Sequence, residues 1–174
     1  MNRLHRALLI FAILLGSVAC DQVTKVAATD NLAGRPAVSM LGGLFRLQYA
    51  ENTGAMLSLG AELSEAARAW IFQGGVFVML LAVLIFAVVS KELDRRQIVA
   101  LSLVVGGGVG NLIDRVFNDG AVVDFMILGV DGLRTGVFNV ADVAIMAGAA
   151  LIALSALRPA PPPSSSSPPQ ELTS

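Results

Sequence analysis

The chain contains long apolar segments that are interrupted by a few carboxylates and amides. Residues 69–89 form a run in which Gln73 is the only strongly polar side chain. As a helix rising about 1.5 Å per residue, such a run crosses the roughly 30 Å of a hydrocarbon core. Residues 137–157 are equally long but carry Asn139 and Asp142 near their start. We therefore expect a membrane protein with acidic groups close to its spans.

Two further segments complete the predicted set of four spans. Residues 98–113 carry the glycines Gly106, Gly107, Gly108 and Gly110, and residues 4–20 follow a basic start. The glycines resemble a phosphate loop only superficially, because no Lys-Ser/Thr pair follows them, and they predict close helix packing instead. The sequence predicts an all-α integral membrane protein with four transmembrane helices.

Composition agrees with a membrane protein and excludes several classes of site. The 174 residues are 55% hydrophobic and 14% charged, with a net charge of −1, which leaves no basic excess to bind nucleic acid. Cys20 and His5 are the single cysteine and histidine. An intrachain disulfide, a zinc site rich in Cys and His, and a histidine-based triad close to a nucleophile are therefore not expected.

The N-terminal segment has a second interpretation. Arg3 and Arg6 before an apolar run, with Cys20 after it, are typical of a lipoprotein leader with an acylated cysteine. A helix that stays in the protein is the favoured interpretation, because Ser17 stands where leucine is preferred and three further apolar segments follow.

Basic residues near the ends of the spans predict the orientation. With four spans, one side of the membrane receives Arg3, Arg6, Lys91, Arg95, Arg96 and Arg158. By the positive-inside rule that side is cytoplasmic, so both termini are expected there. Residues 21–68 and 114–136 then face outwards.

The outward segments show local patterns of their own. Residues 45–49 alternate between apolar and polar, which predicts a half-buried strand in a small extracytoplasmic β-sheet. Residues 61–68, with Ser64 as a possible cap, predict a short interfacial helix. The Pro/Ser-rich tail at 159–174 is expected to be disordered, which leaves residues 1–158 as one membrane domain.

The polar residues allow one kind of hydrolytic chemistry. Asn111 and Asp114 are three residues apart, as are Asn139 and Asp142, so on helices each pair shares a face. Asp124 lies between them in an apolar run. If Asp124 and Asp142 meet, repulsion and desolvation leave one proton shared between two carboxylates, which can then activate water and protonate a leaving group.

Five ordered motifs resemble those of the lipoprotein signal peptidases, the signal peptidase II family. They are Asp21-Gln22-Val23-Thr24-Lys25, Glu51-Asn52-Thr53-Gly54-Ala55, Gly110-Asn111-Leu112-Ile113-Asp114-Arg115, Val122-Val123-Asp124-Phe125 and Phe138-Asn139-Val140-Ala141-Asp142. The resemblance implies an aspartyl endopeptidase of the bacterial inner membrane, with no metal or cofactor. Such an enzyme cuts a prolipoprotein before its diacylglyceryl-modified cysteine, and a globomycin-type inhibitor is expected to occupy its active site.

The resemblance also implies roles for single residues. Asp124 and Asp142 match the catalytic aspartates, without indicating which one carries the proton. Asn52, Asn111, Arg115 and Asn139 match positions that line the site and hold the substrate or the aspartates. Asp21 and Asp114 match acids associated with stability. The sequence itself suggests that Asp21 pairs with Lys25 one helical turn on, and that Asp114 adjoins Arg115 at a helix end.

A small proton-coupled transporter is the rival interpretation, with Asp142 as its ion site. It also predicts buried acids. It does not explain why the polar motifs gather towards one membrane face together with a strand, as an enzyme acting on a lipid-anchored substrate requires.

Overall fold

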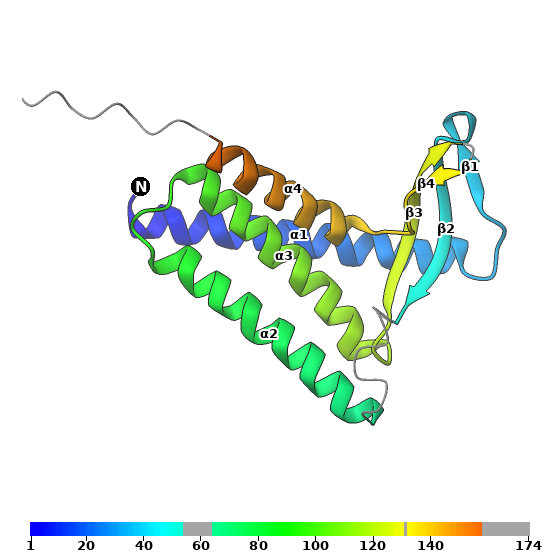
Figure 1. The fold of residues 1–174 in the computed structure, drawn as a ribbon, viewed down its shortest axis with the longest axis horizontal. Coiled ribbons are helices and arrows are strands. Elements are labelled where there is room, and N and C mark those ends of the chain that lie inside the picture. The colour runs from blue at the N-terminus through cyan, green and yellow to red at the C-terminus, as the bar shows by residue number, and fades with distance from the viewer. Residues whose placement is uncertain (54–63, 131, 158–174) are drawn as a thin grey trace, which may run out of the picture.

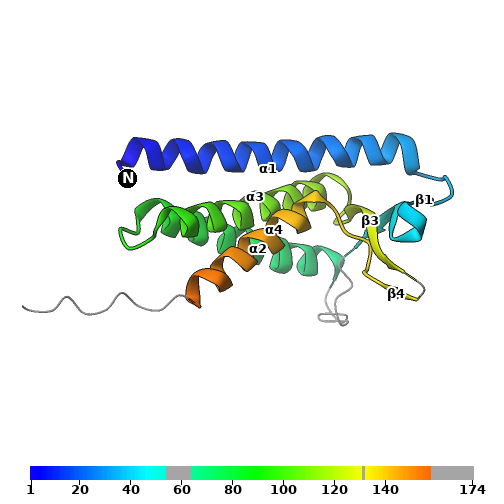
Figure 2. The same ribbon diagram turned by 90° about the horizontal axis from the view of Figure 1, so that it is seen from above.

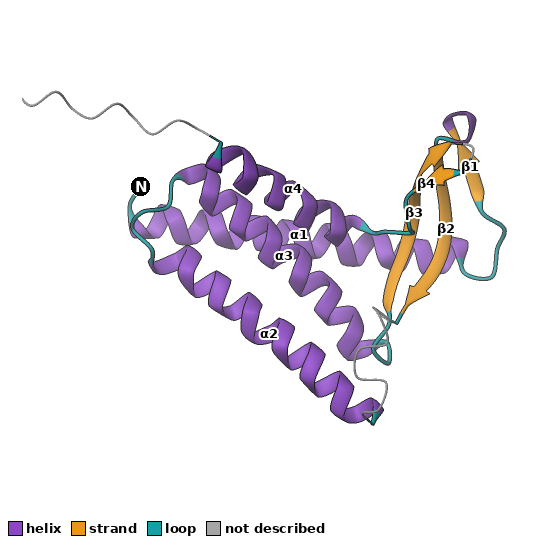
Figure 3. Cartoon of the chain, in the orientation of Figure 1, coloured by secondary structure: helices purple, strands orange, loops and turns teal. Residues whose placement is uncertain are grey.

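The structure is a computed structural model that describes residues 1–53, 64–130 and 132–157. These residues form the helices α1 (Arg3–Leu32), α2 (Glu65–Val89), α3 (Arg95–Phe117) and α4 (Val140–Ala156). A small sheet lies at one end of the helices, and the N-terminus lies at the other end (Figure 1). Figure 3 shows the same division between the helical body and the strands.

Two of the helices are long and apolar enough to cross a membrane. They are Arg3–Leu32 and Arg95–Phe117, and the apolar parts found in the other two helices are the shorter Gln73–Val89 and Val140–Ala156. Large apolar side chains of α1, such as Leu8 and Phe11, are more than half exposed. A surface of this kind suits lipid better than water.

Helix α3 packs against the other three helices, and its glycines allow the close approach. A Cβ atom on Gly106 would lie 2.7 Å from Ser17 Cβ of α1, and one on Gly108 would lie 2.5 Å from Leu80 of α2. A Cβ on Gly107 would collide with the Ala141 carbonyl oxygen of α4. The close packing predicted for these glycines is therefore found on three sides of α3. Figure 2 shows α1 lying to one side of the other three helices.

The four-stranded sheet is antiparallel in the order β1-β2-β3-β4. Its strands are β1 (Val38–Met40), β2 (Phe45–Asn52), β3 (Val122–Val130) and β4 (Leu133–Arg134), and the 3-10 turn η1 (Leu41–Gly43) joins β1 to β2. The strand predicted at residues 45–49 is confirmed as part of β2. In the register of β2 with β3, Ala50 lies opposite Asp124, so Asp124 is held in a strand.

The first helix is longer than the predicted span of residues 4–20. It continues to Leu32, because no glycine or proline follows Gly16 until Gly34 and Pro36. The last three turns were expected in the outward loop, but they carry Lys25 and Ala28 into the interior. The helix therefore reaches beyond the hydrocarbon segment to the sheet.

The short interfacial helix predicted at residues 61–68 is not a separate helix in the part of it that the structure describes. Residues 65–68 form the first turn of α2, while residues 61–63 lie outside the described residues. Gly54 and Ala55 of the second motif and the tail at 159–174 also lie outside them.

The glycine contacts predict a stability effect at Gly107. Gly107→Ala is expected to lower the free energy of unfolding by about 1–3 kcal/mol, because the Ala141 carbonyl and Ile145 Cγ1, 2.8 Å from the new Cβ, would have to move. Thermal unfolding in detergent measures the effect. Gly16→Ala in α1 is the matched control, since no atom lies within 4 Å of its Cβ position. Equal melting temperatures of the two variants would contradict the packing argument.

Candidate active site

The site is built around Lys25, whose ammonium is buried and has an acceptor for each of its three protons. Its Nζ lies 2.8 Å from Asp21 Oδ2, 2.9 Å from Asp114 Oδ2 and 2.9 Å from Asn111 Oδ1. Lys25 and Asp114 are each 3% exposed, and Asp21 is fully buried. Buried charges of this kind are tolerated only when they are paired and fully hydrogen-bonded.

The two carboxylates paired with Lys25 also bind backbone groups from other elements. Asp21 Oδ1 accepts a hydrogen bond from the Ala141 amide of α4 at 2.9 Å. Asp114 Oδ2 accepts one from the Val123 amide of β3 at 3.0 Å. The cluster of Asp21, Lys25 and Asp114 thus joins α1, α3, α4 and β3 at one point.

Asn111 connects this cluster to Asp142. Its Oδ1 accepts from Lys25, which leaves its Nδ2 to donate to Asp142 Oδ1 at 2.9 Å. The Lys25 ammonium can only donate, so it fixes which end of the Asn111 amide faces Asp142. One oxygen of the Asp142 carboxylate is thereby held by a hydrogen-bond donor from α3.

Asn139 connects the two candidate aspartates. Its Nδ2 lies 2.7 Å from Asp124 Oδ1, while its Oδ1 accepts from the Asp142 amide at 2.9 Å. The Asn139 amide in turn donates to Asp142 Oδ2 at 3.1 Å, which completes a capping box at the start of α4. Antiparallel pairing of Phe138 with Met126 on β3 holds the preceding residue in place. The Asp124 and Asp142 carboxylates therefore both bind the fully buried Asn139, Asp124 through its side-chain amide and Asp142 through its backbone amide.

Asp124 is buried, at 3% exposure, on β3. Burial raises the pKa of its carboxyl above the ordinary value, and the negative charge of Asp142 adds to the rise. Three interactions lower this pKa: hydrogen bonds from Asn52 and Asn139, and the positive charge of Lys25. The Asn52 Nδ2 lies 3.0 Å from Asp124 Oδ2. Asp124 consequently holds a proton to higher pH than an exposed aspartate does.

The structure thus brings together eight of the nine residues singled out in the sequence. They are Asn52, Asp124, Asn139, Asp142, Asn111, Asp21, Lys25 and Asp114. Arg115 is the exception, because its guanidinium donates to the Asn111 carbonyl at 3.2 Å and binds no carboxylate among the described residues. The described residues contain no group of three or more His, Cys, Asp or Glu side chains placed to hold a metal ion.

The structure adds to one local prediction and corrects another. Asp114 adjoins Arg115 near the end of α3, but the ion pair that it forms is with Lys25 of α1. Asn139 does not share a helix face with Asp142, because it precedes α4 as its N-cap. Asn is among the preferred N-cap residues, so this part of the geometry was available from the sequence.

Gln22 is a contributor that sequence reasoning left without a role. Its Nε2 lies 2.9 Å from Asp114 Oδ1 and 3.2 Å from the Gly110 carbonyl oxygen, so it joins α1 to α3 beside the Lys25 cluster. Its position between Asp21 and Lys25 in the first motif was the sequence feature that could have indicated this role.

Comparison with known proteins identifies the family. The sequence profile of signal peptidase (SPase) II matches residues 13–158. The chain belongs to the signal peptidase II family. Members of this family are proteases, and the family resemblance seen in the five motifs is confirmed.

Individual relatives agree with this assignment. The chain is 37% identical over 131 residues to a lipoprotein signal peptidase of Treponema denticola, covering 72% of this chain and 75% of that protein. It is 35% identical over 150 residues to one of Geobacter sulfurreducens, covering 84% and 90%. A solved bacterial membrane enzyme, determined by the in meso method at 1.9 Å resolution, has a similar fold, with a TM-score of 0.73, 27% identity and coverage of 86% of this chain and 92% of that one.

The Lys25 cluster generates a prediction about folding. Lys25→Met would leave two buried carboxylates without their cation, so it is expected to destabilise the protein by about 3–5 kcal/mol. Thermal unfolding and the yield of monodisperse protein in detergent measure this. Lys91→Met, at the exposed second lysine of the chain, is the control and is expected to unfold like the wild type. A Lys25→Met protein as stable as this control would show that the cluster does not hold the fold together.

Proposed function

We propose that this protein is an aspartyl endopeptidase that removes the signal peptide from prolipoproteins by cleaving before the diacylglyceryl-modified cysteine. Family membership supports the reaction class. The observation that carries the aspartyl mechanism is the placement of the Asp124 and Asp142 carboxylates on either side of Asn139. Among the described residues, Asp21 and Asp114 are also close together, but both are buried and paired with Lys25, whereas Asp142 is partly exposed and pairs with no cation.

The environments of the two acids favour different roles. Asp142 is in the first turn of α4, is partly exposed, and accepts hydrogen bonds through both oxygens, from the Asn139 backbone amide and from the Asn111 side chain. Asp124 is more deeply buried and has a raised pKa, which favours a carboxylic acid. Asp142 is therefore the base that polarises water, and Asp124 is the acid.

Proton transfers follow from this assignment. As the water oxygen attacks the scissile carbonyl carbon, one water proton passes to Asp142 and the Asp124 proton passes to the carbonyl oxygen. The tetrahedral intermediate then collapses: the C–N bond breaks, the cysteine nitrogen takes the proton from Asp142, and the hydroxyl proton returns to Asp124. Each aspartate ends in its starting state, as general acid–base catalysis requires.

The amides around the aspartates have positioning roles in this scheme. Asn52 is exposed and donates to Asp124 Oδ2, which places it where substrate backbone would pass. Asn111 and Asn139 orient Asp142, and Arg115 contributes to the substrate-binding surface beside them. The partners are a diacylglyceryl-modified prolipoprotein, the phospholipid bilayer and an inhibitor of the globomycin type, and none is a nucleic acid.

The proposed location is the bacterial inner membrane, with four spans and both termini on the cytoplasmic side. The basic residues Arg3, Arg6 and Lys91 gather at the end of the helices that carries the N-terminus, whereas the sheet and Asp124 lie at the opposite end (Figure 1). By the positive-inside rule, the aspartates then face the extracytoplasmic side. There the scissile bond can meet water while the acyl chains stay in the bilayer.

Replacing either aspartate by asparagine tests the reaction. Asp124→Asn and Asp142→Asn are each expected to lower cleavage of a purified diacylglyceryl-modified prolipoprotein by about a hundredfold to ten thousandfold, because each removes one proton-transfer group. A mass shift of the substrate on a gel measures cleavage. Asp119→Asn, at an exposed turn residue, is the control and is expected to cleave normally. Full activity of either aspartate variant in folded protein would falsify the dyad.

The raised pKa of Asp124 predicts a pH effect. Activity requires the Asp124 proton, so it is expected to fall as pH rises through this pKa. Asn52→Ala removes a hydrogen bond that favours the ionised form, so the pKa rises further and the alkaline limb of kcat/KM moves to higher pH. Asp142 and Lys25, the charged groups that act on Asp124, are unchanged in this variant.

The control for this experiment lies on the same strand. Tyr49→Phe removes a hydroxyl that bonds Glu51, and it is expected to leave the alkaline limb in place. A shift of the Asn52→Ala limb to lower pH would contradict the assignment of the proton to Asp124.

A further inference from the structure

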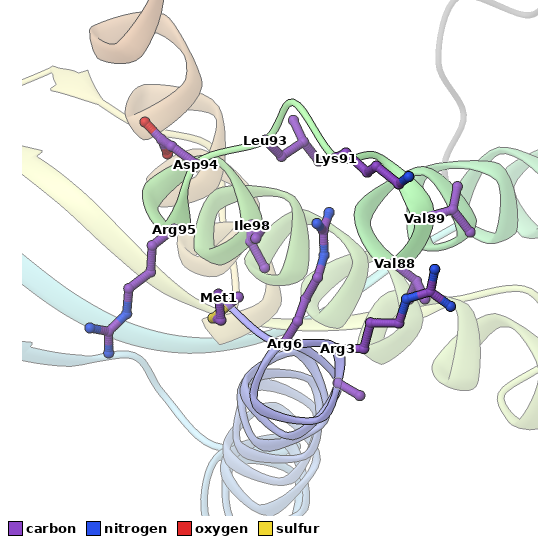
Figure 4. Close-up of a pocket in the computed structure, with 11 residues that line it drawn as sticks. Met1, Arg3, Arg6, Val88, Val89, Lys91, Leu93, Asp94, Arg95 and Ile98 are labelled. Carbon is purple, nitrogen blue, oxygen red and sulfur yellow. The ribbon is translucent and has the colours of Figure 1, made fainter.

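A pocket lies at the end of the helices farthest from the sheet. It has a volume of about 590 Å³ and is lined by the start of α1, the end of α2 and the start of α3 (Figure 4). None of its lining residues belongs to the candidate active site. It therefore needs an explanation other than peptide cleavage.

The pocket is strongly basic. Arg3, Arg6, Lys91 and Arg95 line it, against the single acid Asp94. Figure 4 shows the charged ends of Arg3, Arg6 and Lys91 on the side of the pocket next to α2, while Asp94 and Arg95 lie on the other side. Asp94 is also engaged as the N-cap of α3, where its Oδ1 accepts from the Gln97 amide at 2.8 Å. Three cationic groups thus gather without a neutralising carboxylate.

One of these cations is fixed in place and two are unpaired. The Nε of Arg6 donates to the carbonyl oxygen of Ala87, the buried residue near the end of α2, at 2.7 Å. Arg3 and Lys91 make no ion pair with any described residue. Like charges held close together destabilise one another unless an anion binds between them.

The rim of the pocket is apolar. Val88 and Val89 line it at the end of α2, and they are 48% and 64% exposed. Leu4 and Leu8, on the same turns of α1 as the basic residues, are 66% and 56% exposed. A ligand that fits both surfaces carries a phosphate for the cations and hydrocarbon for the exposed side chains.

We propose that this pocket binds the phosphate headgroup of an anionic phospholipid, whose acyl chains run along the exposed apolar side chains of α1 and α2. Anionic lipids of the cytoplasmic leaflet attract basic residues next to membrane spans. The bound lipid would hold α1 against the α2–α3 turn, where only Arg6 otherwise links them by a described hydrogen bond to α2. The choice of leaflet rests on the orientation proposed above, but the binding itself does not.

Thermal unfolding of the purified full-length protein in detergent tests the proposal. Short-chain phosphatidylglycerol is titrated and compared with phosphatidylcholine of the same chain length and with inorganic phosphate. A saturable rise in melting temperature is expected with phosphatidylglycerol, since a ligand that binds only the folded state stabilises it. Equal shifts with phosphatidylcholine would overturn the preference for an anionic headgroup. Equal shifts with inorganic phosphate would overturn the assignment to a lipid.

Charge removal at matched positions locates the site. Lys91→Gln is expected to weaken phosphatidylglycerol binding about fivefold. The double variant with Arg3→Gln and Lys91→Gln is expected to weaken it more strongly. Arg96→Gln is the control, because Arg96 is exposed at the same end of the molecule but does not line the pocket. An equal loss in Arg96→Gln and Lys91→Gln would overturn the pocket in favour of general surface charge. Peptidase activity is not the readout, so failure here is distinguishable from failure of the proposed function.

Discussion

The Lys25 ammonium is the interaction on which the rest of the site depends. Its three protons meet oxygens of Asp21, Asp114 and Asn111, and the two carboxylates reach on to backbone amides of α4 and β3. A buried cation can only donate, so it sets the direction of every hydrogen bond that follows from it. The positions of α1, α3, α4 and β3 relative to one another therefore depend on the Lys25 charge.

Through Asn111, the Lys25 ammonium also determines which groups face the candidate acids. Because Asn111 accepts from Lys25, its amide nitrogen faces Asp142, and Asn139 then presents its own nitrogen to Asp124. The two carboxylates are chemically identical but receive different surroundings: a helix start for Asp142 and a buried strand for Asp124. Such differences in surroundings let two like acids serve as base and acid.

Much of this arrangement could be predicted from local sequence, and some of it could not. The glycines of α3 predicted close packing, and the alternation at residues 45–49 predicted a strand, because both signals depend on neighbours along the chain. The length of α1 was underestimated, since the outward polar turns were assigned to a loop. The ion pair between Asp114 and Lys25 was not predicted, because only the neighbour of Asp114 in the chain, Arg115, could be read from the sequence.

The sequence by itself determined the apolar segments, the family and the set of polar residues that gather in the site. Only the tertiary structure decided how those residues pair. Asn139 reaches Asp124 across 15 residues, Lys25 reaches Asn111 across 86, and Asp21 reaches the Ala141 amide across 120. Contacts over such separations depend on how helices pack and how strands pair, which no local pattern encodes. The pairing of each carboxylate, and with it the difference between Asp124 and Asp142, is therefore a property of the folded chain.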